Sequence, residues 1–248
     1  MRRSITSASS ISTTISEGAN RVITYIVTEK RENYEKNGGH AVKIKLEKLS
    51  GQPCLVQFYE DVTLEKIKRL GIRAVVFSGY STPLWEHKLE SFRGVYELAR
   101  QGEMPMIGLC GGHQLLGELW AAHNDKKLTK MTGYPIRKLR KDEPDPNPAY
   151  HPGYFKEWGF YPITIVRRDP LFAGVKSGFL ASEFHRCHVP KLPKDFVLLA
   201  TTPGCRIQAF RHKSRIIYGT QFHVENWTDY YPAGKRIIEN FFRIAGIL

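Results

Sequence analysis

Cysteine is scarce in this chain, and long hydrophobic runs are absent. The 248 residues include four cysteines without dense or regular spacing, namely Cys54, Cys110, Cys187 and Cys205. This scarcity argues against a disulfide scaffold and favours a reducing compartment. No apolar run approaches the ~20 residues of a membrane-spanning helix. We therefore expect a cytoplasmic protein without membrane contact.

The first twenty residues contain few charged side chains. They are rich in serine and threonine, and the first acidic residue of the chain is Glu17. This composition is too polar for the core of a secretory signal. We predict a flexible tail over residues 1–20 and a single domain over 21–248. The tail also resembles an organelle transit peptide, which leaves targeting to an organelle as an alternative to the cytoplasm.

Acidic residues are outnumbered, because 37 lysines and arginines face 24 aspartates and glutamates, a net charge of +13. This excess raises a nucleic-acid-binding module as a rival class. Basic clusters occur over residues 137–141 and 211–215. They come without a helix-turn-helix, zinc-finger or RNA-binding signature, so nucleic acid is not the expected partner.

Hydrophobic periodicity and turn signals divide the chain into alternating strands and helices. Strands are expected over residues 21–28, 41–46, 53–59, 73–77, 104–109 and 196–201, with a hairpin between 205–210 and 215–222. Helices are expected over 64–70, 86–100 and 231–247, and another begins at Gly111 or Gly112. This order predicts a three-layer α/β fold with a mostly parallel central sheet, helices on both faces and a small antiparallel β portion.

Cys110 stands where the expected strand 104–109 turns sharply into a helix. The neighbouring glycines Gly108, Gly111 and Gly112 let the backbone bend and let a substrate approach closely. Unpaired N–H groups and the positive dipole end at a helix N-terminus favour a thiolate. Cys110 is therefore a candidate nucleophile, with a buried structural cysteine as the alternative.

A candidate base lies near the C-terminus at His223, two residues before Glu225. In an extended chain, side chains two residues apart point to the same side, so Glu225 can accept a hydrogen bond from the His223 ring. That bond would fix the tautomer and leave the other ring nitrogen free to take a thiol proton. The three residues then form a nucleophile, a base and an orienting carboxylate.

Two motifs together carry a family resemblance. Residues 108–114, Gly-Leu-Cys-Gly-Gly-His-Gln, and residues 221–225, Gln-Phe-His-Val-Glu, resemble the motifs G-φ-C-x-G-x-Q and Q-F-H-P-E of the class I glutamine amidotransferase domain. The similarity runs from about Ile67 to Phe242 and reaches the related γ-glutamyl hydrolase branch. It departs from the family at Val224, which replaces proline, and in the loop Gly79-Tyr80-Ser81, which lacks the usual Gly-Gly-Pro or Pro-Gly.

The resemblance implies a flavodoxin-like fold and assigns roles to particular residues. Cys110, His223 and Glu225 would be catalytic, and the backbone amides of Tyr80 and Gly111 would form the oxyanion hole. Substrate-binding positions are expected at Gly79, Gln114 and His185. The family chemistry implies no cofactor. The expected reaction is hydrolysis of the glutamine γ-amide through a thioester.

The resemblance leaves the fate of the ammonia open. One expectation is an amidotransferase that supplies a separate synthase subunit. The alternative is a free-standing hydrolase of γ-glutamyl amides or peptides. A third class is a non-catalytic scaffold that keeps the fold and binds without reacting.

Two further features have competing interpretations. Residues 137–158 are rich in proline, and we propose that this irregular segment borders the active-site mouth through Tyr150, Tyr154 and Trp158; a plain surface excursion is the alternative. Four residues supply metal-ligand types, but their spacing matches no zinc pattern, so no metal is expected: His185, Cys187, His188 and Cys205.

Overall fold

The computed structural model describes residues 21–35, 38–121 and 133–248. The predicted tail over residues 1–20 lies outside them. None of the helices formed by the described residues is long and apolar enough to span a membrane.

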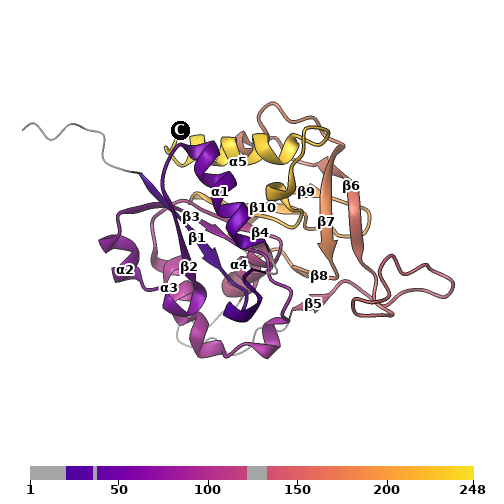
Figure 1. The fold of residues 1–248 in the computed structure, drawn as a ribbon. Coiled ribbons are helices and arrows are strands. Elements are labelled where there is room, and N and C mark those ends of the chain that lie inside the picture. The colour runs from indigo at the N-terminus through magenta and orange to yellow at the C-terminus, as the bar shows by residue number, and fades with distance from the viewer. Residues whose placement is uncertain (1–20, 36–37, 122–132) are drawn as a thin grey trace, which may run out of the picture.

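The described residues form a nine-stranded sheet (Figure 1) in the order β2-β1-β3-β4-β11-β10-β9-β6-β7. The first five strands in this order pair in parallel: β2 (Cys54–Phe58), β1 (Val22–Val27), β3 (Ile72–Phe77), β4 (Met106–Leu109) and β11 (Ile217–Thr220). The remaining strands pair antiparallel: β10 (Ala209–His212), β9 (Phe196–Thr201), β6 (Glu157–Ile165) and β7 (Phe179–His185). A separate antiparallel pair joins β5 (Tyr134–Pro135) to β8 (Cys187–His188).

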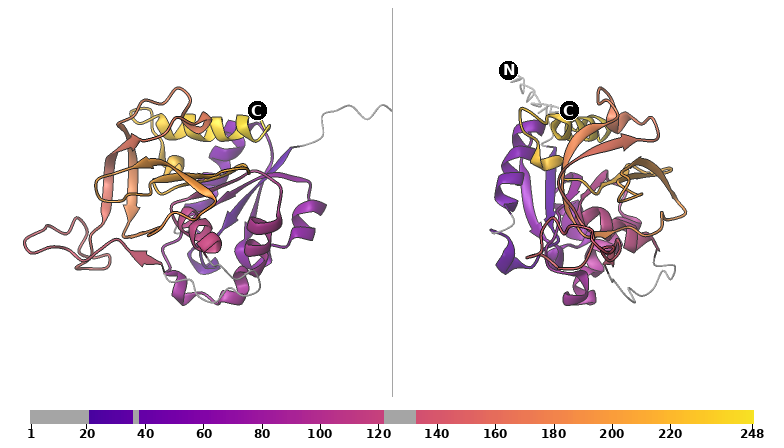
Figure 2. Two further views of the ribbon diagram at one scale, coloured as in Figure 1. Left: turned by 180° about the vertical axis from the view of Figure 1, so that it is seen from behind. Right: turned by 90° about the vertical axis from the view of Figure 1, so that its right-hand side faces the viewer.

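Helices cover both faces of the parallel half (Figures 1 and 2). One apolar cluster joins that sheet to α1 (Gly39–Ser50) and α5 (Ala233–Ile244). The opposite cluster joins it to α2 (Leu64–Arg69), α3 (Arg93–Gln101) and α4 (Gly111–Ala121). Burial on both faces explains why β1, β3 and β4 are mainly apolar, with the exposed Arg73 as the one charged residue among them. The predicted fold class is confirmed.

Parallel pairing brings the carboxyl ends of β1, β3, β4 and β11 to one edge of the sheet. The loops that follow these strands begin at Thr28, Ser78, Cys110 and Gln221. Residues far apart in the sequence therefore meet at this edge.

The prediction of a strand over 41–46 was wrong, because these residues belong to helix α1. Val42, Ile44 and Leu46 alternate with polar residues, which is typical of a strand. In the structure Val42 and Leu46 are buried on one helical face, while Ile44 is 37% exposed. The spacing that decided the fold is therefore i, i+4.

Two other predicted elements have different bounds in the structure. The helix expected over 86–100 is α only over Arg93–Gln101, and short 3-10 turns, η3 (Leu84–Glu86) and η4 (Leu89–Phe92), precede it. In the expected hairpin, the first strand starts at Ala209 instead of Cys205. Further 3-10 turns occur at η1 (Arg31–Asn33), η2 (Tyr59–Asp61), η5 (Pro170–Phe172) and η6 (Val224–Asn226).

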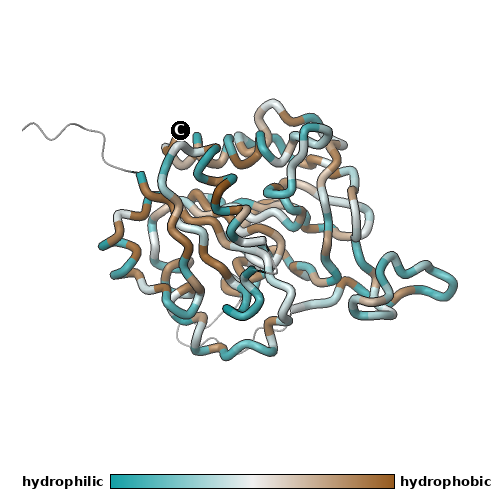
Figure 3. The backbone as a smooth tube through the Cα atoms, viewed as in Figure 1, coloured by the Kyte–Doolittle hydropathy of each residue, from teal (hydrophilic) through white to brown (hydrophobic). Residues whose placement is uncertain are grey.

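The segment between β5 and β6 projects from the body (Figure 1) and is mainly hydrophilic (Figure 3). Its own side chains fasten it. Arg137 donates to both Glu143 oxygens at 2.6 Å, and the fully buried Lys156 ammonium lies 2.6 Å from Asp145. The segment is thus irregular, as predicted, and held by internal ion pairs.

Candidate functional site

Cys110 occupies the turn between β4 and α4. Its backbone is left-handed, with φ of 47°, a conformation that non-glycine residues rarely adopt. The Cys110 N–H donates to Thr220 O at 2.7 Å, and Cys110 O accepts from Gln114 N at 3.1 Å. The turn is therefore strained and anchored on both sides, which fixes the direction of the thiol.

Tyr80 packs against the first turn of α4 at Gly111, which has no side chain. A Cβ atom added to Gly111 would lie 2.7 Å from Tyr80 N, too close for any residue but glycine. Gly79 O accepts from Ser78 Oγ at 2.7 Å. Because the C=O and N–H of a trans peptide point in opposite directions, the Tyr80 N–H points away from that hydroxyl. The two predicted oxyanion amides, those of Tyr80 and Gly111, are thus neighbours.

His223 and Glu225 meet as predicted, although the backbone between them is not extended. His223 Nδ1 lies 2.7 Å from Glu225 Oε1. Glu225 belongs to the 3-10 turn η6, so the expectation of an extended chain was wrong. The tight turn brings the carboxylate back to the ring. The backbone N–H of His223 donates to Ser182 O at 2.9 Å, and this bond holds the turn against β7.

Cys110 and His223, the candidate nucleophile and base, converge on Gly79. A Cβ atom added to Gly79 would lie 3.6 Å from both Cys110 Cβ and His223 Cε1. Burial acts to lower the pKa of His223, but the charges of Cys110 and Glu225 outweigh it and raise this pKa well above its usual value. His223 Nε2 is buried and has no hydrogen-bond partner among the described residues. This nitrogen is free to exchange a proton at the Cys110 side of the ring.

Glu29 is a site residue that the sequence analysis missed. Its carboxylate accepts from Ser81 N at 2.6 Å, Ser81 Oγ at 2.8 Å and Thr82 N at 3.0 Å. Burial acts to raise the pKa of Glu29, but the hydrogen bonds from Thr82, Ser81 and Lys30 bring it down to about 2. Glu29 thereby holds the loop that carries Gly79 and Tyr80. An available signal was its place just after the buried strand β1, at the active edge of the sheet.

Gln114 is placed at the site, but its polar atoms already have partners. Its Nε2 donates to Cys187 O at 2.8 Å and to Gln221 Oε1 at 3.1 Å. Its Oε1 accepts from the Tyr80 hydroxyl at 3.0 Å. Gln221 Nε2 in turn donates to Cys110 Sγ at 3.5 Å. The predicted substrate-binding Gln114 is therefore one member of a buried network that ends on the Cys110 sulfur.

His185 lies beneath this network, inside a pair of buried carboxylates. Its Nδ1 donates to Cys187 O at 2.8 Å, and its Nε2 lies 3.0 Å from Glu157 and 3.1 Å from Glu183. Burial acts to lower the pKa of His185, but the Glu183 charge and the hydrogen bonds to both carboxylates raise it to about 10. Both ring nitrogens face oxygen atoms, an arrangement that favours the imidazolium form of His185. It reaches the site through Cys187 O.

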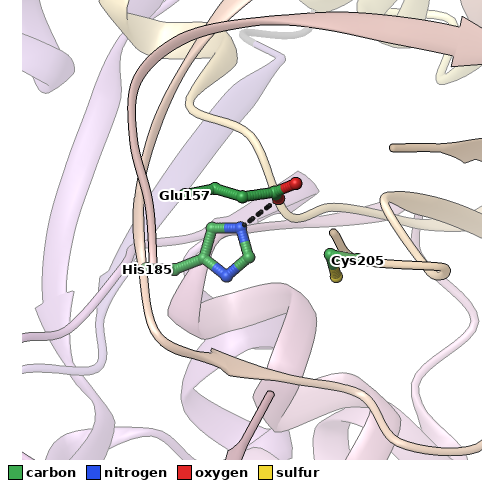
Figure 4. Close-up of side chains that lie close together, drawn as sticks. All are labelled: Glu157, His185 and Cys205. Carbon is green, nitrogen blue, oxygen red and sulfur yellow. Dashed lines mark hydrogen bonds and ion pairs between the residues drawn. The ribbon is translucent and has the colours of Figure 1, made fainter. Parts of the chain in front are cut away.

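The structure brings together two of the four residues that the sequence analysis considered as metal ligands. His185 and Cys205 lie with Glu157, their ligand atoms within 4.8 Å of one another (Figure 4). The oxygens of Glu157 already accept hydrogen bonds from Thr202, Gln208 and His185. The cluster is therefore a hydrogen-bonded ion pair, and it does not include Cys187 or His188.

A cleft of about 370 Å³ opens at Cys110 and His223. Its outer wall is aromatic: Tyr150 lies 5.2 Å from Trp158 between ring centroids, and Trp158 lies 5.2 Å from Phe184. Tyr150 and Trp158 line the cleft as predicted, whereas Tyr154 does not. On the Gln114 side, a second cavity of only about 30 Å³ is bounded by Tyr80, Cys110 and His185, among others. It has room for about two waters.

Known proteins resemble this chain in sequence and in fold. A family model for class I glutamine amidotransferases matches residues 34–245. The chain is 27% identical over 187 residues to a glutamine-hydrolysing GMP synthase of Clostridium novyi (75% of this chain, 30% of that protein). It is 28% identical over 148 residues to a glutamine-hydrolysing GMP synthase subunit of Methanopyrus kandleri (59% of this chain, 64% of that protein), so the chain spans less than two thirds of either relative. The fold matches the glutaminase domain of Trypanosoma brucei CTPS, solved with bound acivicin, with a TM-score of 0.63 and 15% identity over 91% of this chain and 94% of that one.

Proposed function

Because the chain belongs to the class I glutamine amidotransferase family, we propose that it hydrolyses the glutamine γ-amide at Cys110 and passes the ammonia to a separate synthase subunit. The observation that carries this proposal is the convergence of Cys110 and His223 on Gly79, with Glu225 bound to the far side of the ring. A carbonyl group placed over Gly79 would meet the nucleophile and the base together.

The proposed reaction has two steps. His223 takes the proton of the Cys110 thiol, the sulfur bonds to the amide carbon, and the oxyanion that forms is stabilised by the Tyr80 and Gly111 backbone amides. His223 then protonates the leaving nitrogen, the C–N bond breaks and ammonia departs, which leaves a γ-glutamyl thioester. In the second step His223 takes a proton from water, the hydroxide attacks the thioester, and glutamate leaves as the thiol is restored. Glu225 stabilises the imidazolium in both steps.

The name of one reported relative supports a separate ammonia acceptor. The Methanopyrus protein is one subunit of a GMP synthase. By analogy, the acceptor here is a synthase carried on another chain. This part of the proposal rests on resemblance and not on the geometry of the site.

Covalent labelling tests the nucleophile directly. Acivicin was found bound to the trypanosomal glutaminase domain. It should label the wild-type chain once, on the peptide that contains Cys110. Cys110→Ala and Cys110→Ser should abolish both the labelling and ammonia release from glutamine, whereas Cys54→Ala, which changes a cysteine buried in β2, should retain them. Labelling at another cysteine, or full activity of Cys110→Ala, would contradict the proposal.

The size of the cleft favours a second candidate, the hydrolysis of γ-glutamyl amides with bulky leaving groups. Ammonia needs no room, yet the 370 Å³ cleft beside Cys110 has an aromatic wall of Tyr150, Trp158 and Phe184. Such a wall suits an aromatic amine. A higher kcat/KM for γ-glutamyl anilide than for glutamine, lost in Trp158→Ala, would favour this candidate. The reverse preference would reject it.

A further inference from the structure

A chain of buried amides leads from the His185 cation to the Cys110 sulfur. We propose that Gln221 is a further catalytic residue, whose side-chain N–H stabilises the Cys110 thiolate, and that Gln114 and the Cys187 carbonyl hold that amide in the donating orientation. The inference rests on Cys110 being the nucleophile of the proposed function. It adds a group that touches the reacting atom.

The orientation of Gln221 follows from its neighbours. The Cys187 carbonyl can only accept, so the Gln114 atom that faces it at 2.8 Å must be the N–H₂ group. The same nitrogen lies 3.1 Å from Gln221, whose facing atom must then be the carbonyl oxygen. This leaves the Gln221 amide nitrogen toward Cys110 Sγ, at 3.5 Å. A flipped Gln221 would oppose two N–H₂ groups and turn an oxygen toward the thiolate.

The base of the chain is fixed as well. His185 Nδ1 donates to the same Cys187 carbonyl, and its Nε2 is held between Glu157 and Glu183. All of these groups are at most 5% exposed, apart from Cys187, which is half-buried. Since water cannot replace the buried partners, the polarity of the chain is built into the fold.

A donor at the sulfur matters most in the state that carries charge. Hydrogen bonds to charged groups are about twice as strong as those between neutral groups. The N–H of Gln221 therefore favours the thiolate over the thiol and supplements the N-terminal dipole of α4. The effect does not require substrate, so the free protein can report it.

The test is the rate of Cys110 alkylation by iodoacetamide at pH 7, followed by mass spectrometry of the Cys110 peptide. Gln221→Met removes the donor at similar volume and should lower the rate about tenfold or more. Gln221→Glu, of the same shape, turns an acceptor toward the sulfur and should lower the rate further. The matched control is Gln57→Met, which removes another buried side-chain amide. Gln57 lies in β2 and donates to Thr24 Oγ1 at 3.0 Å. This variant should keep the wild-type alkylation rate.

Folding is checked by circular dichroism and by the melting temperature of each variant. A folded Gln221→Met or Gln221→Glu that alkylates at the wild-type rate would overturn the inference. If neither variant folds, Gln114→Met replaces them in the test, because it frees the Gln221 amide to rotate. Gln114→Met must then lower the alkylation rate, and an unchanged rate would overturn the inference. The proposed glutaminase function fails separately, through absence of ammonia release from a wild-type protein whose Cys110 alkylates rapidly.

Discussion

Tyr80 stands in a loop position where the family motif usually has glycine, and its side chain reaches into the site. Its hydroxyl donates to Gln114 Oε1 at 3.0 Å, and the ring bounds the 30 Å³ cavity beside Gln114. The cavity is too small for the glutamyl part of a substrate, so a substrate that binds to the Gln114 oxygen must first displace the Tyr80 hydroxyl. Tyr80 would then compete with the substrate for Gln114, and it also carries one of the two backbone amides proposed for the oxyanion hole.

Removal of the hydroxyl should make substrate binding easier. In Tyr80→Phe the Gln114 oxygen is free and the backbone amide is unchanged, so we expect KM for glutamine to fall about fivefold, the equivalent of one hydrogen bond of ~1 kcal/mol, with kcat little altered. Steady-state ammonia release gives both constants. Tyr96→Phe on α3 is the control, and a raised KM in Tyr80→Phe would mean that the hydroxyl binds substrate itself.

At the scale of elements, helix α1 supports the turn that carries His223, the proposed base. Lys45 Nζ donates to the Glu225 carbonyl at 2.7 Å, and its ammonium lies 4.6 Å from the centroid of the Trp227 ring. The helix thus reaches across to η6, more than 170 residues later in the chain. The predicted strand over 41–46 did not reveal this contact. In such a strand Lys45 would lie on the polar face, opposite Val42, Ile44 and Leu46.

The support from α1 predicts a catalytic effect from a residue that touches no reacting atom. Lys45→Met leaves the Glu225 carbonyl without its side-chain donor, which should lower the free energy of unfolding by ~1–2 kcal/mol. The loosened turn should lower kcat severalfold with little change in KM. Lys43→Met, which removes only the surface pair with Glu47, should cost less than about 1 kcal/mol and leave kcat unaltered. Equal kcat in the two variants would contradict the role of Lys45.

The whole molecule should be most stable at intermediate pH, because two buried groups titrate at opposite ends. The pKa of Glu29 is lowered to about 2, so its contribution is present above its unfolded value near 4.5 and is lost as pH falls toward 2. The pKa of His185 is raised to about 10, so its contribution is present below its unfolded value near 6.5 and is lost as pH rises toward 10.

Urea unfolding at a series of pH values checks both limbs. Glu29→Gln should weaken the decline below pH 4.5, and His185→Gln should weaken the decline above pH 6.5. At pH 7 His185→Gln should also cost about 3 kcal/mol or more, since it leaves a buried carboxylate pair without its cation. An alkaline limb identical to wild type in His185→Gln would show that the buried cluster is neutral.

The sequence reveals those parts of the molecule that local order determines. Cys110 with its glycines, and His223 with Glu225, are adjacent in the chain, so their motifs predict the turn and the pair directly. The bond from Glu29 to Ser81 spans 52 residues, and the bond from Gln221 to Cys110 spans 111. Such contacts depend on which strands are neighbours and in which register, and neither periodicity nor spacing contains that information.

The left-handed backbone of Cys110 affects the stability of the fold. Because φ is 47°, glycine fits this position with less strain than any other residue, and Cys110→Gly should exceed Cys110→Ala in unfolding free energy by about 1 kcal/mol. Thermal melts of the two inactive variants measure the difference. Every residue with a Cβ atom bears this backbone strain at position 110, and glycine would relieve it. The turn that aims the Cys110 thiol therefore lowers the stability of the fold that holds it.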